Sequence, residues 1–154
     1  MIIPKYVIKD STINNAGKGF FLNEKIKKGS IIIAPDNINS IYSYEDLNRF
    51  DKDSIEYLSY VRWFDQHYSI CPEWSDECYV NHSSAPTGLY HLGFVFAYDH
   101  WDSGTEITID YSLLTHENEP LGFNDTMTNK PVMGLTWQEA FKRSTIDLLR
   151  IISD

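Results

Sequence analysis

The sequence predicts an α+β fold made mainly of short, irregular strands, with one internal helix and one C-terminal helix. Short β-rich runs recur between turn-forming residues along most of the chain. Capped helical patterns occur once in the middle and once at the end. The 154 residues suit one domain, and 42% hydrophobic residues suffice for a single core.

The N-terminal part is predicted to consist of strands joined by tight turns. "KYVIKD" (5–10) alternates like a half-buried strand. Asn14-Asn15 and Gly17-x-Gly19 supply turn chemistry before the β-rich run "GFFL". Lys28-Gly29 marks another tight turn, which leads into "SIIIA".

Residues 43–60 are predicted to be helical. Ser43 is a suitable N-cap with Asp46 three residues later. Apolar side chains then recur at helical spacing, at Tyr44, Leu47 and Phe50.

The remaining segments predict strands, a long loop and a terminal helix. Residues 60–74 favour strand and turn, "YHLGFVFAYD" (90–99) is expected as a strand, and so is "TEITIDY" (105–111). Residues 112–135 are loop-like because they contain Pro120, Gly122, Pro131 and Gly134. Thr136 and Glu139 form a capping-box pattern before the clearest helix. Its predicted apolar face consists of Trp137, Ala140, Phe141, Leu148 and Ile151.

Composition limits the partners that the chain is expected to bind. The formal net charge of -9 disfavours direct contact with a nucleic-acid backbone and suits a basic peptide or protein surface. No apolar run is long enough to span a membrane, and the N-terminus lacks the apolar core of a signal peptide. We therefore expect a soluble intracellular protein, with cytoplasm and nucleus both open. Cys71 and Cys78 do not form a disulfide framework and are expected as free thiols.

Three segments carry the motifs that point to a function. They are "AGKGFFLNEKIKKGSIII" (16–33), "YVNHSSAP" (79–86) and "FVFAYDHWDSGTEITIDYS" (94–112). In this order they resemble the SET-domain family of protein lysine methyltransferases. That family has a Gly-x-Gly turn, an Asn-His-Ser-Cys-x-Pro-Asn loop and a final Gly-Glu-Glu-Leu/Ile-Thr-x-Asp-Tyr motif.

The resemblance covers about residues 3–112 and implies a SET-type fold. Such a fold has short curved β-sheets, a knot-like C-terminal crossing and a terminal helix. We expect residues 1–112 to form the catalytic core. Residues 113–154 are expected to complete the same domain as a loop and a helix.

The resemblance also implies S-adenosyl-L-methionine as cofactor and a lysine in a protein or peptide, within a basic segment, as substrate. It implies that Tyr111 lies at the methyl-transfer centre. The implied cofactor contacts are Lys18, Gly19, Phe20, Asn81 and His82. A glycine in this turn has a physical reason, because the absence of Cβ lets the backbone approach a ligand closely. No metal and no oligomeric state is implied.

Methyl transfer to an amine requires alignment, desolvation and a neutral nucleophile. Lysine in water has a pKa near ~10.4, so the free amine is scarce at neutral pH. A narrow apolar channel disfavours the ammonium form, and aromatic walls tolerate a cationic product.

The sequence departs from the family pattern at several positions. Ser84 stands where Cys is usual, Thr87 where Asn follows Pro, and Thr105 replaces the first Glu of the final motif. Ile109 replaces a Tyr or Phe of many members, which by resemblance favours more than one methylation. No cysteine-rich tail follows Tyr111, so we expect the 112–154 segment to close the site, with Trp137 or Phe141 near the cofactor.

Two alternatives remain open at this point. The departures would suit a catalytically degenerate SET-like module that binds a peptide or protein partner. A small zinc-stabilised domain is the other, since four residues have the ligand types of a tetrahedral site: His67, Cys71, Cys78 and His82. Their spacing fits no common zinc pattern. Taken singly, Gly17 and Gly19 also suit a simple hairpin turn, and Tyr111 also suits an aromatic residue of the core.

Overall fold

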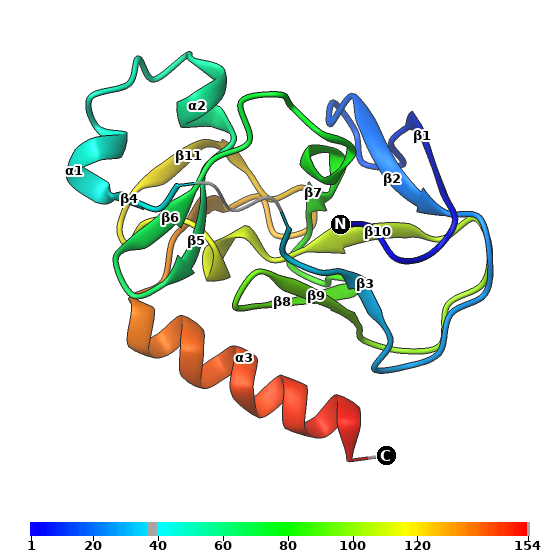
Figure 1. Cartoon of the computed structure of the whole chain (residues 1–154). Helices are drawn as coiled ribbons and strands as arrows, with labels where there is room; N and C mark the ends of the chain where they lie inside the picture. The colour runs from blue at the N-terminus through cyan, green and yellow to red at the C-terminus, as the bar shows by residue number, and fades with distance from the viewer. Residues whose placement is uncertain (37–39, 154) are drawn as a thin grey trace.

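The computed structural model describes residues 1–36 and 40–153, and it contains short sheets with one long helix at the C-terminus (Figure 1). The strands are β1 (Tyr6–Asp10), β2 (Lys18–Leu22), β3 (Ile31–Ile33), β4 (Tyr42–Ser43), β5 (Val61–Phe64), β6 (His67–Ser69), β7 (Asn81–His82), β8 (Gly88–His91), β9 (Phe94–Ala97), β10 (Glu106–Ile109), β11 (Pro120–Asn124) and β12 (Pro131–Met133). The helices are α1 (Tyr44–Leu47), α2 (Ile55–Leu58) and α3 (Trp137–Ile152), with 3-10 turns η1 (Asp76–Tyr79) and η2 (Tyr111–Leu113). The predicted α+β class is confirmed.

The strands form four small sheets rather than one continuous sheet. Their orders are β1-β2-β10-β7, β3-β9-β8, β4-β6-β5 and β11-β12. Neighbouring strands are antiparallel except β7 and β10, which run parallel. The first two sheets share a core in which Phe20, Leu89 and Ile107 are fully buried. Because β2, β8 and β10 each supply one of these residues, they are fixed relative to one another.

The helix predicted over residues 43–60 is interrupted. The Ser43–Asp46 capping box is present and starts α1, which ends at Leu47. Ser54 caps α2, since its side chain accepts a hydrogen bond from the Tyr57 N–H at 3.2 Å. The polar stretch between the two helices therefore acts as a second start signal, which the apolar spacing alone did not reveal.

The single strand predicted over residues 90–99 is a hairpin of β8 and β9. Leu92 and Gly93 both have positive φ, at 50° and 83°, which is the backbone conformation of a two-residue hairpin turn. The prediction was wrong because leucine rarely adopts positive φ and gives no turn signal.

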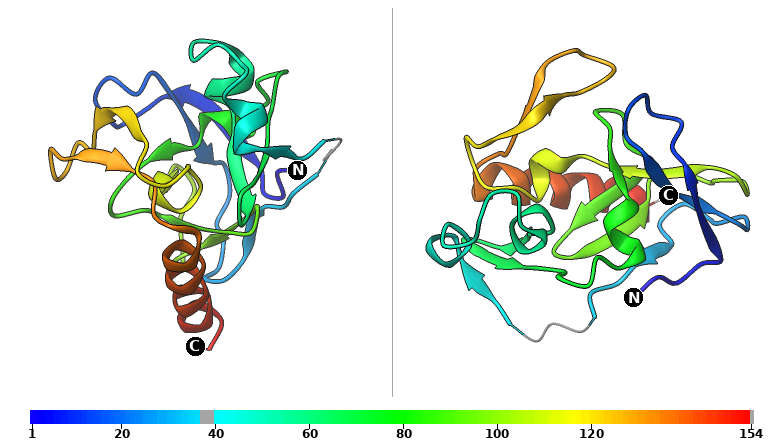
Figure 2. Two further views of the ribbon diagram at one scale, coloured as in Figure 1. Left: turned by 90° about the vertical axis from the view of Figure 1, so that its left-hand side faces the viewer. Right: turned by 90° about the horizontal axis from the view of Figure 1, so that it is seen from above.

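The loop predicted over residues 112–135 also contains a hairpin, β11 and β12, which projects from the body (Figure 2). Glu119, at the base of the hairpin, accepts hydrogen bonds from Tyr44 of α1 and Tyr57 of α2. Both strands begin with proline, at Pro120 and Pro131. Proline is accepted at the first position of a strand and on an edge, so its presence misled the prediction of a loop.

The predicted C-terminal helix is confirmed. α3 begins after the Thr136–Glu139 capping box and packs against β8 and η2. Ala140, Ser144 and Ile151 are buried on its inner face, whereas Phe141 is 41% exposed. None of the helices in the described residues is long and apolar enough to cross a membrane.

Candidate active site

The segment around Asn81 and His82 lies beside the segment that ends in Tyr111. β7 and β10 pair in parallel, with His82 opposite Ile109, and the Ser83 N–H donates to the Ile109 carbonyl at 3.0 Å. Beyond this pairing, the Tyr111 hydroxyl donates to the Val80 carbonyl at 2.7 Å. The two segments, far apart in sequence, are therefore joined on both sides of the parallel pairing.

Asn81 connects this crossing to the Gly-x-Gly turn. Its Nδ2 donates to the Lys18 carbonyl at 2.9 Å and to Glu106 Oε1 at 3.2 Å. Both amide protons are thus committed, which leaves Oδ1 and the backbone of Asn81 for a ligand. The structure brings the predicted residues Lys18, Gly19 and Asn81 together.

Phe20 contributes to this group in a different way. Its side chain is fully buried and stacks on Tyr6, with ring centroids 4.9 Å apart. Only the backbone of Phe20 is therefore available for a contact with a ligand.

Glu106 is the polar centre that holds the turn in place. Its carboxylate accepts hydrogen bonds from Ser11 Oγ at 2.6 Å, from the Thr12 N–H at 2.8 Å and from Asn81. Burial opposes its ionisation, but these hydrogen bonds outweigh burial and lower the pKa of Glu106. A Cβ on Gly19 would lie 2.3 Å from Glu106 Oε1, so glycine is required there for close packing.

His82 is held by its side chain as well as by its strand. Its Nδ1 accepts a hydrogen bond from the Tyr111 N–H at 3.1 Å, and its Nε2 lies 3.4 Å from Asp125 Oδ2. Burial lowers the pKa of His82 despite the nearby carboxylates of Asp110 and Asp125. The imidazole is therefore neutral at physiological pH, and only the backbone of His82 is free to contact a cofactor.

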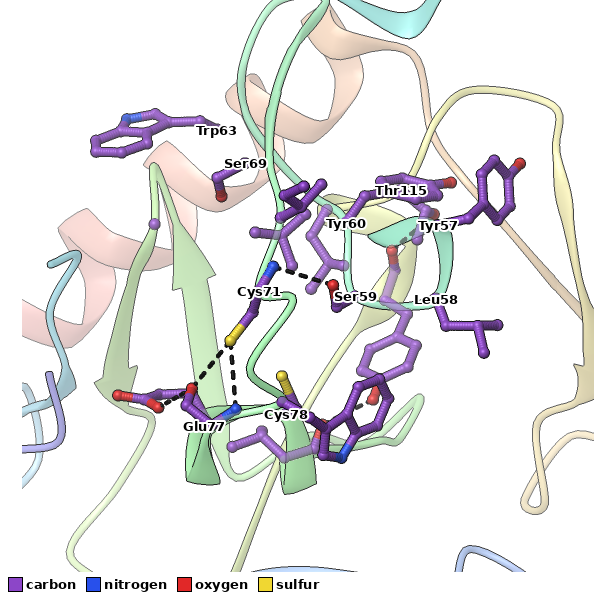
Figure 3. Close-up of a pocket in the computed structure, with 18 of the residues that line it drawn as sticks. Tyr57, Leu58, Ser59, Tyr60, Trp63, Ser69, Cys71, Glu77, Cys78 and Thr115 are labelled. Carbon is purple, nitrogen blue, oxygen red and sulfur yellow. Dashed lines mark hydrogen bonds between the residues drawn. The ribbon is translucent and has the colours of Figure 1, made fainter. Parts of the chain in front are cut away.

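A large cavity of about 1010 Å³ has Tyr111 in its wall, and Figure 3 shows part of its lining. Its walls come from residues 57–61, 69–75 and 119–123, and both Ile109 and Tyr111 line it. Aromatic side chains form much of the lining: Tyr42, Tyr57, Tyr60, Trp63, Trp74, Tyr90 and Phe123. Carboxylates outnumber basic groups around it, with Asp36, Asp53, Glu73, Glu77 and Glu119 against Lys52 and the amino group of Met1.

Tyr111 lines this cavity and also contacts the Asn81–His82 segment, since its N–H donates to His82 Nδ1. Burial raises the pKa of Tyr111, so its phenol stays protonated. Its ring packs edge-on against Phe123, with centroids 6.3 Å apart. The position and protonation of Tyr111 suit a group that orients a reactant rather than one that removes a proton.

Comparison with family models matches a SET domain to residues 17–112. The chain belongs to the SET-domain family. The comparison with curated proteins finds no match. Among solved structures, the chain is similar to one titled "Structure of ctPRC2 in complex with H3K27me3 and H3K27M", at TM-score 0.58 and 19% identity. The likeness covers 85% of this chain and 16% of that chain, and at this identity it shows the fold alone.

The SET domain accounts for the crossing described above, because the expected knot-like arrangement joins the Asn-His segment to the final Asp-Tyr segment. It does not account for the residues after 112, which lie outside the matched range. The predicted division into a core of residues 1–112 and a completing segment of residues 113–154 stays a prediction.

Two of the residues that depart from the family pattern, Ser84 and Thr87, form side-chain hydrogen bonds in this structure. Ser84 Oγ donates to Asp125 Oδ1 at 2.9 Å. Thr87 Oγ1 donates to the Glu106 carbonyl at 2.9 Å and accepts from the Thr108 N–H at 2.9 Å. Both side chains are therefore integrated into the site.

The alternative zinc site does not gather its ligands. No cluster of three or more His, Cys, Asp or Glu side chains with metal-ligand geometry occurs within residues 1–36 and 40–153. His82 is bonded to Tyr111 instead, and His67 stacks on Phe64. Cys71 and Cys78 are free thiols in the cavity wall, and burial raises the pKa of Cys78 to about 12 (Figure 3).

The aromatic residues that approach the SET crossing are not the ones expected. Trp137 and Phe141 stack on each other, and Phe141 stacks on His91, whereas the ring contacts of His82 are with Tyr111 and Phe123. The ring of Phe123, from β11, instead packs against both His82 and Tyr111. Met127 is 67% exposed and its sulfur accepts from Ser83 Oγ at 3.8 Å.

Sequence reasoning missed two carboxylates that organise the site. Asp125 contacts His82, and Glu119 accepts hydrogen bonds from Tyr44 at 2.8 Å, Tyr57 at 2.5 Å and Lys52 at 3.0 Å. Both lie in the segment that was predicted to be a loop. No short-range pattern marks their contacts with His82, Tyr44, Tyr57 and Lys52, because these partners are distant in sequence.

Proposed function

We propose that this chain is an S-adenosyl-L-methionine-dependent protein-lysine N-methyltransferase. The observation that supports it best is that Tyr111 contacts both a large cavity and the segment proposed to hold the cofactor. Tyr111 lines the cavity of about 1010 Å³, and its N–H donates to His82 of the Asn81–His82 segment. A lysine entering from the cavity would meet a cofactor held by the turn and the crossing.

The residues present fit the proposed cofactor. The backbone at Gly17 is open, since a Cβ there would meet nothing within 4 Å. Phe123 and Met127, 42% and 67% exposed, offer an apolar surface next to His82 for a heterocycle. We propose contacts from Lys18, Gly19, Phe20, Asn81 and His82. S-adenosyl-L-methionine, when bound, supplies a methyl group on a positively charged sulfur.

The cavity suits a protein segment that presents a lysine. Its excess of carboxylates attracts a basic segment, and its aromatic walls near Tyr111 can pack along the lysine stem. Burial of the amine in these walls disfavours the ammonium form, so a proton leaves to water before transfer. The neutral nitrogen then forms the new N–C bond as the S–C bond breaks.

Tyr111 is proposed to orient the amine. Because its hydroxyl proton is donated to the Val80 carbonyl at 2.7 Å, the lone pairs on its oxygen remain available as acceptors. An amine N–H directed to this oxygen would fix the direction of the nitrogen lone pair. Correct alignment of this kind supplies much of the rate in a displacement reaction.

The alternative of a degenerate binding module predicts binding without turnover. The partners of Ser84 and Thr87 described above show that these departures are accommodated, and Asn81 and Tyr111 are retained. We therefore place the methyltransferase first. The two functions are distinguished by methyl transfer.

The first test is calorimetric titration with S-adenosyl-L-methionine of the wild type, Asn81→Ala and the exposed control Asn23→Ala. We expect binding to the wild type and the control and strong weakening in Asn81→Ala. Thermal unfolding of each variant separates lost contacts from lost folding. No binding to the folded wild type at millimolar cofactor would contradict the proposal.

A methylation screen on lysine-containing peptide arrays then tests turnover with Tyr111→Phe. This variant keeps the ring and removes only the hydroxyl, so we expect cofactor binding to persist while methyl transfer falls at least about 100-fold. Charge reversal at Glu73 and Asp53 is expected to weaken selection of basic peptides. Cofactor binding by the wild type without methylation of any peptide would favour the degenerate module.

A further inference from the structure

Asp125 links the β11–β12 hairpin to the SET crossing. It is 5% exposed, and its carboxylate accepts hydrogen bonds from both the backbone and the hydroxyl of Thr128, each at 2.7 Å. It also accepts from the Ser84 N–H at 3.2 Å and the Ser84 hydroxyl at 2.9 Å. Although burial opposes ionisation, these bonds lower the pKa of Asp125 to about 2, so it is a carboxylate at neutral pH.

The partner of this carboxylate is the imidazole of His82, whose side chain is 7% exposed. Nδ1 accepts the Tyr111 N–H at 3.1 Å, and an acceptor nitrogen carries no proton. With Nδ1 as this acceptor, the proton of the neutral ring is on Nε2, which lies 3.4 Å from Asp125 Oδ2. The Ile109 carbonyl also faces the ring and would accept a proton from the other tautomer, so Asp125 is the group that can decide between the two. A carboxylate at this position stabilises the Nε2-protonated tautomer, because its oxygen attracts the Nε2–H group. In the other tautomer the same oxygen would face the lone pair of Nε2 and repel it.

A second carboxylate does not provide the same control. Asp110 Oδ1 lies 4.0 Å from His82 Nδ1 and accepts the Ser112 N–H at 3.0 Å, while Asp110 Oδ2 pairs with Arg143 at 3.1 Å. Asp110 is thus occupied by other donors, and its distance from His82 exceeds that of a hydrogen bond.

We propose that Asp125 is a positioning residue for methyl transfer: by holding His82 in the Nε2-protonated tautomer, it fixes the Tyr111 backbone and therefore the direction of the Tyr111 hydroxyl. This role rests on the proposed function. It places a determinant of the reaction in the C-terminal segment, beyond residues 17–112 that match the SET domain.

The effect reaches the hydroxyl through a short chain of atoms. Tyr111 is held at two points, its N–H by His82 and its hydroxyl by the Val80 carbonyl. If His82 adopts the other tautomer, two N–H groups face each other at 3.1 Å and the Tyr111 backbone must move. The ring then shifts relative to Val80, and an oriented amine loses its alignment.

The decisive variant is Asp125→Asn, with Thr128→Val as the matched control. Asparagine keeps one oxygen for the two Thr128 donors and the Ser84 hydroxyl, but it sets an N–H against both His82 Nε2 and the Ser84 N–H. Thr128→Val removes one hydrogen bond to Asp125 and leaves its charge and its contact with His82. Histidine ¹⁵N chemical shifts report the tautomer of His82, and the Tyr111 amide shift reports its hydrogen bond, without any turnover.

We expect His82 to be Nε2-protonated in the wild type and in Thr128→Val, and to lose that preference in Asp125→Asn with a change of the Tyr111 amide shift. The kcat for peptide methylation should fall roughly 10- to 100-fold in Asp125→Asn, by analogy with the loss of a group that orients a metal-ligating histidine. Cofactor affinity and peptide KM should stay within about twofold, because only alignment is lost.

Two results overturn the proposal. The first is a wild-type His82 that is not Nε2-protonated, which needs no variant to fold. The second is an Asp125→Asn protein whose kcat equals that of the control. If the wild type itself binds cofactor without turnover, the proposed function fails, and the NMR measurements still decide separately whether Asp125 sets the tautomer.

Discussion

Replacing Glu106 with glutamine tests whether the carboxylate holds the Gly-x-Gly turn to the crossing. Glu106 is 8% exposed and accepts from Ser11, Thr12 and Asn81. Glutamine has nearly the same shape but replaces one acceptor oxygen with a donor. Hydroxyl partners can rotate to accept, whereas the Thr12 N–H and the Asn81 amide cannot.

The expected cost follows from these bonds. One backbone or amide donor is left without an acceptor, which costs about 1–3 kcal/mol, and the other bonds lose their charge assistance. Together these losses lower the free energy of unfolding by about 2–4 kcal/mol. At a typical urea dependence of about 2 kcal/mol per molar, the unfolding midpoint falls by about 1–2 M. The exposed Glu73→Gln variant is the control and should leave the midpoint unchanged.

The dependence of folding stability on pH gives a second test of the role of the Glu106 carboxylate. The pKa of Glu106 is lowered in the folded state, so its carboxylate stabilises the fold fully above the unfolded pKa of about 4.3. This contribution is lost as the pH falls through the lowered folded value. The difference in stability between the wild type and Glu106→Gln should therefore shrink between about pH 5 and pH 2. A difference that stays constant over this range, or a variant as stable as the wild type at pH 7, would refute the reasoning.

Three further variants test neighbouring steps. Gly19→Ala should lower the urea midpoint because its Cβ would lie 2.3 Å from Glu106 Oε1, and Gly17→Ala should lower it for a different reason, because Gly17 has a φ of 73° that strains alanine although the space is open; a Gly19→Ala protein with the wild-type midpoint would contradict the packing argument. Ile109→Tyr should shift products toward a single methylation in mass spectra, since a larger side chain narrows the channel; an unchanged product pattern would show that other residues set it. Glu119→Gln should weaken the contact of α1 and α2 with β11 and raise peptide KM about tenfold or less, while cofactor affinity stays constant.

Local chemistry made some of the fold predictable from sequence. The capping boxes at Ser43 and Thr136 are complete within four residues, so both helix starts were identified. The turn at Leu92–Gly93 was missed because the tertiary structure imposes positive φ on a leucine. The β11–β12 hairpin was missed because its prolines indicate loops when its pairing is unknown.

The candidate site was predictable only in part, for a similar reason. Motifs in order identified the residues that meet at the crossing, including Asn81 and Tyr111. Their partners could not be inferred, because Ser11 reaches Glu106 across 95 residues of sequence and Ser84 reaches Asp125 across 41. Such pairs are set by the fold and leave no periodic pattern.

The proposed site and the polar framework of the fold share residues, which limits how variants can be interpreted. Asn81 is both a proposed cofactor contact and a donor to Glu106, so Asn81→Ala alters binding and stability together. Ser11→Ala separates the two, because Ser11 donates to the same Glu106 oxygen as Asn81, at 2.6 Å, and is not a proposed cofactor contact. If Ser11→Ala lowers stability as much as Asn81→Ala yet retains cofactor affinity, the loss in Asn81→Ala reports a direct contact. If affinity falls equally in both, the carboxylate network orders the turn, and the contact at Asn81 is indirect.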